Sequence, residues 1–331
     1  MNRPCRAALG VVLCLALTVP AGAGGPTGDP TVTLAFVGDI NLDGLPGKLV
    51  RRGGDPFTPF AVLLAEADIR VGNLECVVAT RGEPIPKKPY TFRAHPRTLT
   101  SLKRHFDAVS LANNHSGDFG PAAFGDLLAL LNRRGIGYFG GGTNLAQAHR
   151  PLIVERHGLR IALLGYDEFL PRSFEADSDR PGVAWSEDQQ VQHDIAEARS
   201  RDHADLVVPF MHWGWEHETL ASPRQRRLAR LMIDAGADAV VGSHPHVVQD
   251  TEEYRGRPIV YSLGNFVFDG FSEDVANTGW LLRLELARDG ARAWRTYTAR
   301  IDRQGIPHPN RATDGNCWQR GQAEPAPCRA Q

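Results

Sequence analysis

The chain has 331 residues, a hydrophobic content of 42% and a formal net charge of −1 at pH 7. This length is enough for one large α/β domain or two modest ones, each with its own core. The near-zero charge gives no electrostatic bias toward nucleic acid or an acidic membrane surface, so we expect no nucleic-acid partner.

The first 24 residues predict a secretory signal peptide. A basic start with Arg3 and Arg6 precedes an apolar run of about a dozen residues, and small residues follow at Ala21 and Ala23. A single membrane anchor is the alternative, but the run is shorter than the ~20 residues that a spanning helix needs. We expect cleavage near Ala23 and an exported protein, periplasmic or extracellular.

The next part of the chain alternates between two patterns. Apolar β-rich runs and helical patterns follow each other as TVTLAFVGD, FAVLLAEA, IRVGNLE, LTSLKRHF, AVSLANNH and AAFGDLLALLNRR. Such alternation predicts βαβ units and a largely parallel sheet.

The second half continues the alternation. RIALLGY and DLVVPFMH predict buried strands, with a helix from about Glu187 to Asp202 between them. SPRQRRLARLMIDAG predicts a helix that begins after a serine cap and ends at a glycine, and it leads into the strand DAVVGSH. PIVYSLGNFVF, WLLRLELA and AWRTYTARI predict strands, the last two as a hairpin about Asp289 and Gly290.

Residues 25–303 are expected to form one domain, and the composition of residues 304–331 predicts an irregular C-terminal tail. The spacing of Cys317 and Cys328 in this tail suits a local disulfide in an oxidising compartment, with two free thiols as the alternative. Cys76 lies in an apolar run and is expected to be a buried thiol.

Polar side chains stand at the carboxyl ends of the predicted strands. These are Asp39 and Asn41; Asn73 and Glu75; Asn113, Asn114 and His115; His212; and His244 and His246. A parallel sheet brings such ends to one edge, so the groups can meet although they are far apart in sequence. One aspartate there is usually a turn residue or a helix cap. Five sets of mixed carboxylate, amide and imidazole chemistry predict a metal site instead.

The types of ligand restrict the metal. Several imidazoles disfavour magnesium and calcium, and the absence of thiolates disfavours a structural zinc cage. We therefore expect one or two divalent ions of manganese, iron or zinc. In a two-metal site the ions lie about 3.5 to 4 Å apart, and a bridging water acts as hydroxide at neutral pH.

The motif order is more specific than any single motif. GD, GNLE, ANNH, HWG followed by Glu216, GSHPH and SLGNF resembles the bacterial capsule-synthesis CapA family, also called poly-γ-glutamate synthesis proteins, and through it the calcineurin-like metallophosphoesterases. The resemblance covers residues 31–285. It implies an α/β fold, a four-layer α/β/β/α sandwich of metallophosphoesterase type with mixed sheets flanked by helices. It also implies a role with poly-γ-glutamate or another anionic capsule or surface polymer, and a capsule-synthesis complex at the membrane as a partner.

The resemblance assigns ligands residue by residue. Asp39 is the first-strand carboxylate, Asn41 stands where the metallophosphoesterases have a histidine, and Glu75 stands in place of their bridging aspartate. The remaining implied ligands are Asn114, His212, His244 and His246.

Other residues are expected to act beside the ligands. His115 is expected to stabilise or protonate a leaving oxygen, and Asp118 to orient His115. Four residues are expected to support the ligands through hydrogen bonds: Asn73, Asn113, Glu216 and Asn265.

A basic segment follows the GNLE motif. RGEPIPKKPYTFRAHPRTLTSLKR has seven basic residues and the single acid Glu83. Beside the site it would bind an anionic substrate through Lys87, Lys88 and Arg93. A solvated, proline-stiffened loop is the alternative.

Three functions fit these patterns. The first is an exported hydrolase of phosphoesterase type, in which metal hydroxide attacks a phosphorus or carbonyl centre of a phosphoester or an anionic polymer. The second is a non-catalytic polymer-binding or export component of the capsule machinery. The third is a periplasmic binding domain without a metal.

Overall fold

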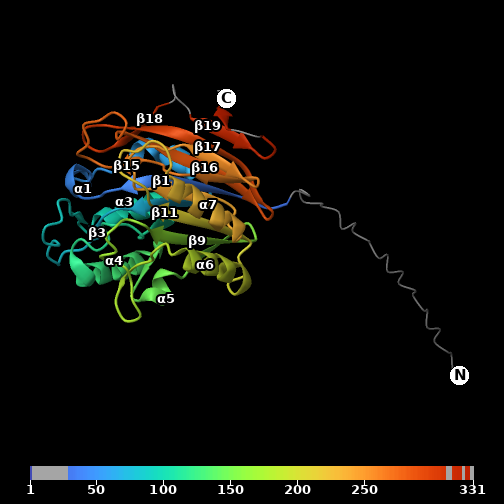
Figure 1. The fold of residues 1–331 in the computed structure, drawn as a ribbon, viewed down its shortest axis with the longest axis horizontal. Helices are drawn as coiled ribbons and strands as arrows, with labels where there is room; N and C mark the ends of the chain where they lie inside the picture. The colour runs from blue at the N-terminus through green and yellow to red at the C-terminus, as the bar shows by residue number, and fades with distance from the viewer. Residues whose placement is uncertain (2–28, 311–314, 323–324, 329–331) are drawn as a thin grey trace.

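The computed structural model describes Met1 and residues 29–310, 315–322 and 325–328 (Figure 1). Apart from Met1, the expected signal peptide lies outside these residues. Among the residues described, no helix has the length and apolar character needed to span a membrane.

The larger sheet has ten strands. They are β1 (Thr31–Ile40), β2 (Ile69–Leu74), β5 (Ala108–Ser110), β6 (Gly137–Phe139), β15 (Asn265–Val267), β16 (Thr278–Ala287), β17 (Gly290–Ile301), β18 (Pro307–Pro309), β19 (Asn316–Gln319) and β20 (Ala326–Pro327). Their order is β20-β19-β17-β16-β1-β2-β5-β6, and β15 pairs with β1 while β18 pairs with β17. The strands β1, β2, β5 and β6 are parallel, as the alternating pattern predicts.

The smaller sheet has six strands. They are β8 (Leu152–Arg156), β9 (Leu159–Asp167), β11 (Leu206–His212), β12 (Val240–Ser243), β13 (Thr251–Tyr254) and β14 (Arg257–Val260), in the order β13-β14-β12-β11-β9-β8. Its four central strands are parallel, but both edge strands are antiparallel. The expectation of a largely parallel sheet is thus wrong at the edges, where short hairpins join consecutive strands.

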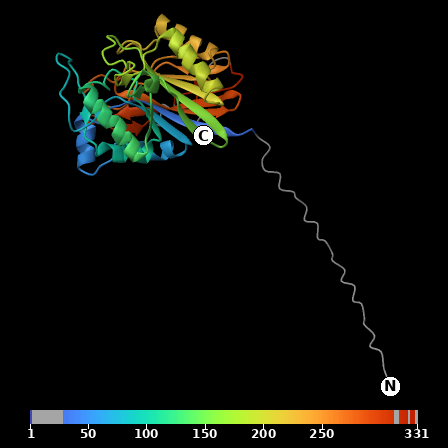
Figure 2. The ribbon, with the colours of Figure 1, turned by 90° about the horizontal axis from the view of Figure 1, so that it is seen from below.

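The helices cover the outer faces of the two sheets. They are α1 (Gly44–Arg51), α2 (Ala61–Ala65), α3 (Thr98–His105), α4 (Gly120–Arg134), α5 (Leu145–Ala148), α6 (Asp188–Ser200) and α7 (Pro223–Asp234), with a 3₁₀ turn at Thr58–Phe60. Two further pairs of short strands are β3 (Val77–Val78) with β4 (Arg93–Ala94), and β7 (Gly141–Gly142) with β10 (Gly182–Val183). Figure 2 shows α4 and α6 on opposite sides of the sheets.

Three hydrophobic layers hold the sheets and helices together. Alternate residues of β1 face opposite ways, so Leu34 and Phe36 pack against the second sheet while Ala35 and Val37 pack toward α2, α3 and α4. The other face of the second sheet packs on α6 and α7. Strands buried on both faces need continuous apolar runs, which the sequence supplies. The result is a four-layer α/β/β/α sandwich, which confirms the predicted fold class.

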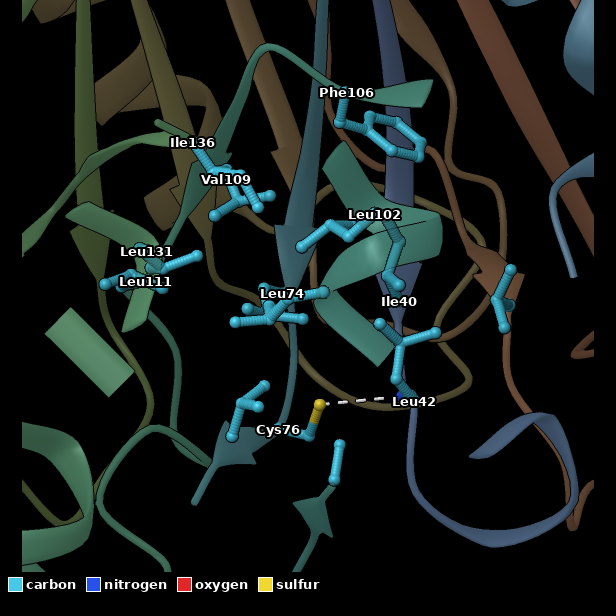
Figure 3. Packing of buried hydrophobic residues seen from close by; sticks show 14 of the residues in the cluster. Ile40, Leu42, Leu74, Cys76, Leu102, Phe106, Val109, Leu111, Leu131 and Ile136 are labelled. Carbon is cyan, nitrogen blue, oxygen red and sulfur yellow. Dashed lines mark hydrogen bonds between the residues drawn. The ribbon is translucent and has the colours of Figure 1, made fainter. Parts of the chain in front are cut away.

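The core beside the first sheet contains the free thiol. Cys76 is buried among Leu74, Leu102 and Leu111, and its Sγ atom accepts the backbone N–H of Leu42 at 3.5 Å (Figure 3). Burial raises the pKa of this thiol well above its ordinary value. The structure therefore confirms Cys76 as a buried thiol.

One predicted strand is in fact two. The segment 258–268 continues in the second sheet only as far as β14, and its last residues form β15 in the first sheet. Gly264 lies between them with φ of 65°, in the left-handed region that favours glycine. The chain therefore crosses from one sheet to the other at this point and brings Asn265 beside Asp39.

The C-terminal tail differs from the irregular segment that its composition predicts. Its described residues add β18, β19 and β20 to the larger sheet, and Trp318 is buried in the layer between the sheets. Cys317 and Cys328 form the expected disulfide. A tail rich in polar residues is ordered here because one tryptophan and one crosslink fix it to an existing sheet edge.

Candidate metal centre

Residues from the ends of strands in both sheets meet at one place. Asp39 is the next-to-last residue of β1, Glu75 follows β2, His212 ends β11, and His244 and His246 follow β12. The backbone N–H of His244 donates to Oδ2 of Asp39 at 3.3 Å, which links the two sheets directly. All five side chains are buried. The structure therefore brings these five side chains, which are far apart in the sequence, to one place.

Glu75 lies at the centre of this group. Its Oε1 atom is 3.7 Å from Nε2 of His212, 3.8 Å from Nε2 of His246 and 3.9 Å from Nε2 of His115. Within the described part of the chain, neither carboxylate oxygen of Glu75 has a hydrogen-bond partner. A buried polar atom without a partner costs about 1 to 3 kcal/mol, and more when it is charged.

Two sets of potential ligands share Glu75. One set is Glu75, His212 and His244, and the other is Asp39, Glu75 and His246; in each, the ligand atoms lie within 4.8 Å of one another. The Nε2 atom of His244 is also buried and without a partner among the described residues. Carboxylate oxygens and neutral imidazoles that lack partners are the donor set that a divalent ion satisfies. The residues present therefore fit a metal, with Glu75 common to both sets.

Two of the histidines are held neutral. Burial lowers the pKa of His212 well below its ordinary value, and the neighbouring His244 lowers it further. Burial lowers the pKa of His244 to about 3. Because only the neutral ring offers a lone pair to a cation, both side chains are in the protonation state that metal binding requires.

The carboxylates differ in their surroundings. Burial and the charge of Asp39 raise the pKa of Glu75 well above its ordinary value. Burial acts in the same direction on Asp39, but hydrogen bonds from His246 and Asn73 outweigh it and lower the pKa of Asp39. Without a cation, one negative charge is therefore stable at this site and the second is not.

Asparagine side chains fix the ligands in position. Asn73 donates from Nδ2 to Oδ1 of Asp39 at 2.8 Å, and the same atom lies 3.1 Å from Nδ1 of His212. Asn113 donates to Oδ1 of Asn73 at 3.0 Å. Oδ1 of Asn265 lies 2.9 Å from Nδ1 of His246, which leaves Nε2 of that ring facing Glu75. Such neighbours orient a ligand and select its tautomer.

The amide of Asn114 faces the same centre. Its Oδ1 atom lies 2.9 Å from Nε2 of His212. The next residue, His115, has its Nδ1 atom 2.7 Å from Oδ2 of Asp118 and its Nε2 atom toward Glu75. Burial lowers the pKa of His115, although Asp118 opposes this effect. His115 is thus a neutral imidazole whose orientation Asp118 fixes.

Three further expected site residues differ in their contacts. Oδ1 of Asn41 accepts the backbone N–H of Asp43 at 2.9 Å, which closes a turn before α1. Lys87 is exposed. Arg93 donates to the carbonyl of Gly82 at 2.7 Å and stacks on Phe119.

Lys88 and Glu216 have surroundings that differ from those expected. Lys88 points inward and donates to Asp118 rather than standing free for an anionic substrate. Glu216 is exposed, and its charge contributes to the raised pKa of Glu75.

The backbone of the ligand loop is unusual. His244 and His246 have φ of 97° and 57°, in a region that side chains other than glycine seldom adopt. Such strain persists only where the surroundings fix it, and it is frequent at functional sites.

Four aromatic side chains form the wall of the site, and the sequence did not single them out. Phe92 stacks at 4.3 Å from His115, and Phe169 lies 4.9 Å from His244, between ring centroids. Phe268 and Phe271 lie 5.1 and 5.2 Å from His246. Phe268 and Phe271 follow the SLGNF motif by a few positions, and Phe92 and Phe169 stand outside the motifs. Single phenylalanines carry no signal that separates a site wall from ordinary core.

Asp167 is a further buried carboxyl at the same edge. It ends β9, and its Cα pairs with that of His212 in the neighbouring strand. Burial raises its pKa to about 7. The signal that could have found it is the one used for the others, a polar residue directly after the apolar run RIALLGY.

The family match and two similar curated relatives all concern capsule synthesis proteins. The family described as "Bacterial capsule synthesis protein PGA_cap" matches residues 33–270. The PGA biosynthesis protein CapA of Bacillus subtilis (strain 168) is 34% identical over 246 residues, covering 73% of this chain and 64% of that protein. The capsule biosynthesis protein CapA of Bacillus anthracis is 33% identical over 246 residues, covering 72% and 60%. The chain thus spans about three fifths of the length of these relatives.

Two solved structures that resemble this chain have lower sequence identity to it than these relatives. The NAD nucleotidase of Haemophilus influenzae has a TM-score of 0.46 and 12% identity, covering 85% of this chain and 54% of that one. The sulfate thiohydrolase SoxB of Thermus thermophilus has a TM-score of 0.46 and 14% identity, covering 84% and 58%.

Proposed function

This chain belongs to the bacterial capsule synthesis protein family PGA_cap, and from that premise we propose that it is a metal-dependent hydrolase acting in the synthesis of poly-γ-glutamate or another anionic surface polymer. The polymer is inferred from the names of two relatives, the PGA biosynthesis protein CapA and the capsule biosynthesis protein CapA. The chemistry comes from the residues of the candidate metal centre.

One observation carries the proposal. Glu75 is buried with both oxygens unpartnered among the described residues, and it belongs to two ligand sets at once. A structural role does not account for a carboxylate kept at this cost, whereas a pair of divalent ions, or one ion and a water, would satisfy it. Manganese, iron and zinc suit the mixture of carboxylate, amide and imidazole donors.

The ligands would be divided between two positions. One position would be held by His212 and His244 with the nearby amide of Asn114, the other by Asp39 and His246, and Glu75 would be common to both. When bound, divalent ions supply Lewis acidity and make a water nucleophilic at neutral pH.

The protein residues supply the remaining chemistry. His115 directs its Nδ1–H to Asp118 and presents an unprotonated Nε2 toward Glu75, so Nε2 can take up a proton from the attacking water and pass it to a leaving oxygen. Phe92, Phe169 and Phe268 cover the imidazoles and restrict the access of bulk water. Both features suit hydrolysis of a phosphoester or an amide-linked anionic polymer.

Export is part of the proposal. The basic start, short apolar run and small residues within positions 1–24 support secretion and a periplasmic or extracellular location. The disulfide between Cys317 and Cys328 agrees with an oxidising compartment. Polymer assembly at the membrane would then place the protein beside a capsule-synthesis complex.

The test combines metal analysis with two substrates. The purified protein, stripped by chelation, is reloaded with manganese, iron or zinc, and its hydrolysis of bis(4-nitrophenyl) phosphate and of poly-γ-glutamate is measured by dye release and by polymer length. We expect metal to be retained and at least one substrate to be cleaved. Retained metal with neither substrate cleaved, but with polymer bound, would favour a non-catalytic component of the capsule machinery. Failure to retain any of the three metals would refute the proposal.

A further inference from the structure

We propose that Lys88 is a positioning residue of the metal centre, which holds the carboxylate of Asp118 and the backbone of Asn114 and thereby sets the orientation of His115. The inference deepens the proposed function, and only its kinetic test depends on that function.

The carboxylate of Asp118 collects three donors around one buried position. Nζ of Lys88 donates to Oδ1 at 2.5 Å, while Oδ2 accepts the backbone N–H of Phe92 at 2.7 Å and lies 2.7 Å from Nδ1 of His115. The Asp118 side chain has no exposed surface. Its two oxygens are therefore shared between Lys88 on one side and His115 on the other.

The same ammonium group reaches the ligand segment. Nζ of Lys88 donates to the carbonyl oxygen of Asn114 at 2.6 Å. The side chain of Asn114 faces His212, and the next residue along the chain is His115. One cation thus fixes the backbone between a candidate ligand and the residue that would handle the proton.

The environment explains why this position needs a lysine. A fully buried carboxylate without a cation is strongly unfavourable, and the ammonium of Lys88, with 22% of its side chain exposed, supplies the compensating charge. With Lys88 removed, Oδ1 of Asp118 loses the Lys88 donor, and the carboxylate keeps only the two partners of Oδ2. The orientation of His115 then loses its support.

Lys88 is distinguished from the adjacent lysine by the backbone. Lys87 has φ of 64°, and it is exposed while Lys88 is half-buried. The left-handed residue turns the chain so that only the second lysine of the pair reaches Asp118. A substrate-binding lysine would remain free at the surface, whereas Lys88 is committed to two protein acceptors.

The first experiment is a steady-state comparison with bis(4-nitrophenyl) phosphate in the manganese-loaded protein. Lys88→Met keeps the aliphatic stem and removes the donor. Loss of a residue that supports a site side chain typically costs 10- to 100-fold, and we expect kcat to fall by about this factor while KM changes less than about twofold. Lys103→Met is the matched control, because Nζ of Lys103 also donates to a backbone carbonyl at 2.6 Å, that of Gly135.

The second experiment needs neither metal nor substrate. The far-downfield proton NMR signal of the His115 imidazole N–H, assigned by its loss in His115→Ala, is followed in metal-free protein. We expect it to shift or vanish in Lys88→Met and to stay in Lys103→Met. The buried pair of His149 and Asp194, with Nδ1 and Oδ2 2.7 Å apart, gives an internal reference for correct folding. If Lys88→Met loses that reference signal, Lys88→Gln replaces it with the same expectations.

The outcomes separate the two proposals. A displaced His115 signal together with a reduced kcat supports the role of Lys88. A displaced signal in a protein that hydrolyses nothing supports that role and contradicts the hydrolase. An unchanged His115 signal, an unchanged kcat in an active enzyme, or a raised KM with kcat intact would overturn the positioning role, and the last of these would return Lys88 to substrate binding.

Discussion

Nε2 of His212 lies 3.1 Å from Nδ1 of His244, and burial holds both rings neutral. The same Nε2 atom is 2.9 Å from the amide oxygen of Asn114 and 3.7 Å from Oε1 of Glu75. Four nitrogen and oxygen atoms therefore surround one small volume. A single ring proton can satisfy only one such contact, whereas a cation satisfies all of them.

The first prediction concerns stabilisation by metal. A ligand that binds only the folded state stabilises it by about 2.7 kcal/mol at 100 times its Kd. We expect manganese or zinc to raise the Tm of the chelator-stripped protein, and Glu75→Gln to remove most of this rise because both ligand sets contain Glu75. The exposed helical residue His193 gives the control His193→Ala. Equal metal-induced shifts in the two variants would exclude Glu75 as a ligand.

The second prediction concerns pH and the metal-free protein. In the unfolded chain His244 titrates near pH 6.5, but in the folded protein its pKa is about 3. Between these values the unfolded state binds a proton that the folded state does not. The His244 contribution therefore lowers stability as pH falls from 6.5 toward 3, by at most about 1.4 kcal/mol per pH unit. Urea unfolding of wild type and His244→Asn from pH 4 to 8 should show a shallower acid slope in the variant; parallel curves would contradict it.

The third prediction separates His115 from the ligands. General acid or base catalysis contributes about 10²- to 10⁴-fold, so His115→Ala should lower kcat by such a factor while metal content, measured by elemental analysis, stays unchanged. Asp118→Asn should have a smaller effect in the same direction, because Asp118 acts only through the orientation of His115. Metal loss in His115→Ala would instead make His115 a ligand.

The fourth prediction concerns the close packing of β1 against the start of β15, next to Asp39. A Cβ atom on Gly38 would lie 1.8 Å from the carbonyl oxygen of Gly264, so Gly38→Ala must push β15 away from β1. Overpacking of this kind costs about 1 to 3 kcal/mol, and metal affinity should fall with stability. Gly125→Ala is the matched control, since nothing lies within 4 Å of its Cβ and it sits inside α4. That change should stabilise the protein by up to about 1 kcal/mol.

The fifth prediction concerns the tail. Removing a crosslink across so short a loop costs at most about 3 kcal/mol of loop entropy. Because Cys317 adjoins the buried Trp318, we expect Cys317→Ser with Cys328→Ser to lower Tm and to increase hydrogen exchange in β19. If hydrogen exchange in β19 of the double variant is as slow as in the wild type, Trp318 alone holds the tail.

Residues of the candidate metal centre could be predicted from the sequence wherever the end of a strand could be predicted. Asp39, His212 and His244 follow unmistakable apolar runs, so their shared edge follows from the geometry of parallel strands. Asp167 obeys the same rule and was missed only because it lacks a neighbouring motif. Asn41 was assigned by position in a motif, but a local hydrogen bond to Asp43 decides its conformation.

Other features depend on contacts that no local pattern encodes. The segment 258–268 reads as one strand, because the crossing between sheets depends on the backbone at Gly264 rather than on hydrophobicity. The partner of Lys88 lies 30 residues away, and a basic loop looks the same in sequence whether its lysines face solvent or a buried carboxylate. Trp318 orders a tail whose composition predicts disorder.

The bond between Asp39 and His244 joins residues 205 positions apart in the chain. A growing polypeptide therefore carries its first ligand long before its last, and no intermediate length possesses the complete centre. Both candidate ligand sets are complete only after synthesis has passed His246 and the two sheets have come together. Any ion that requires the complete set of ligands would consequently be selected where folding finishes rather than where translation begins.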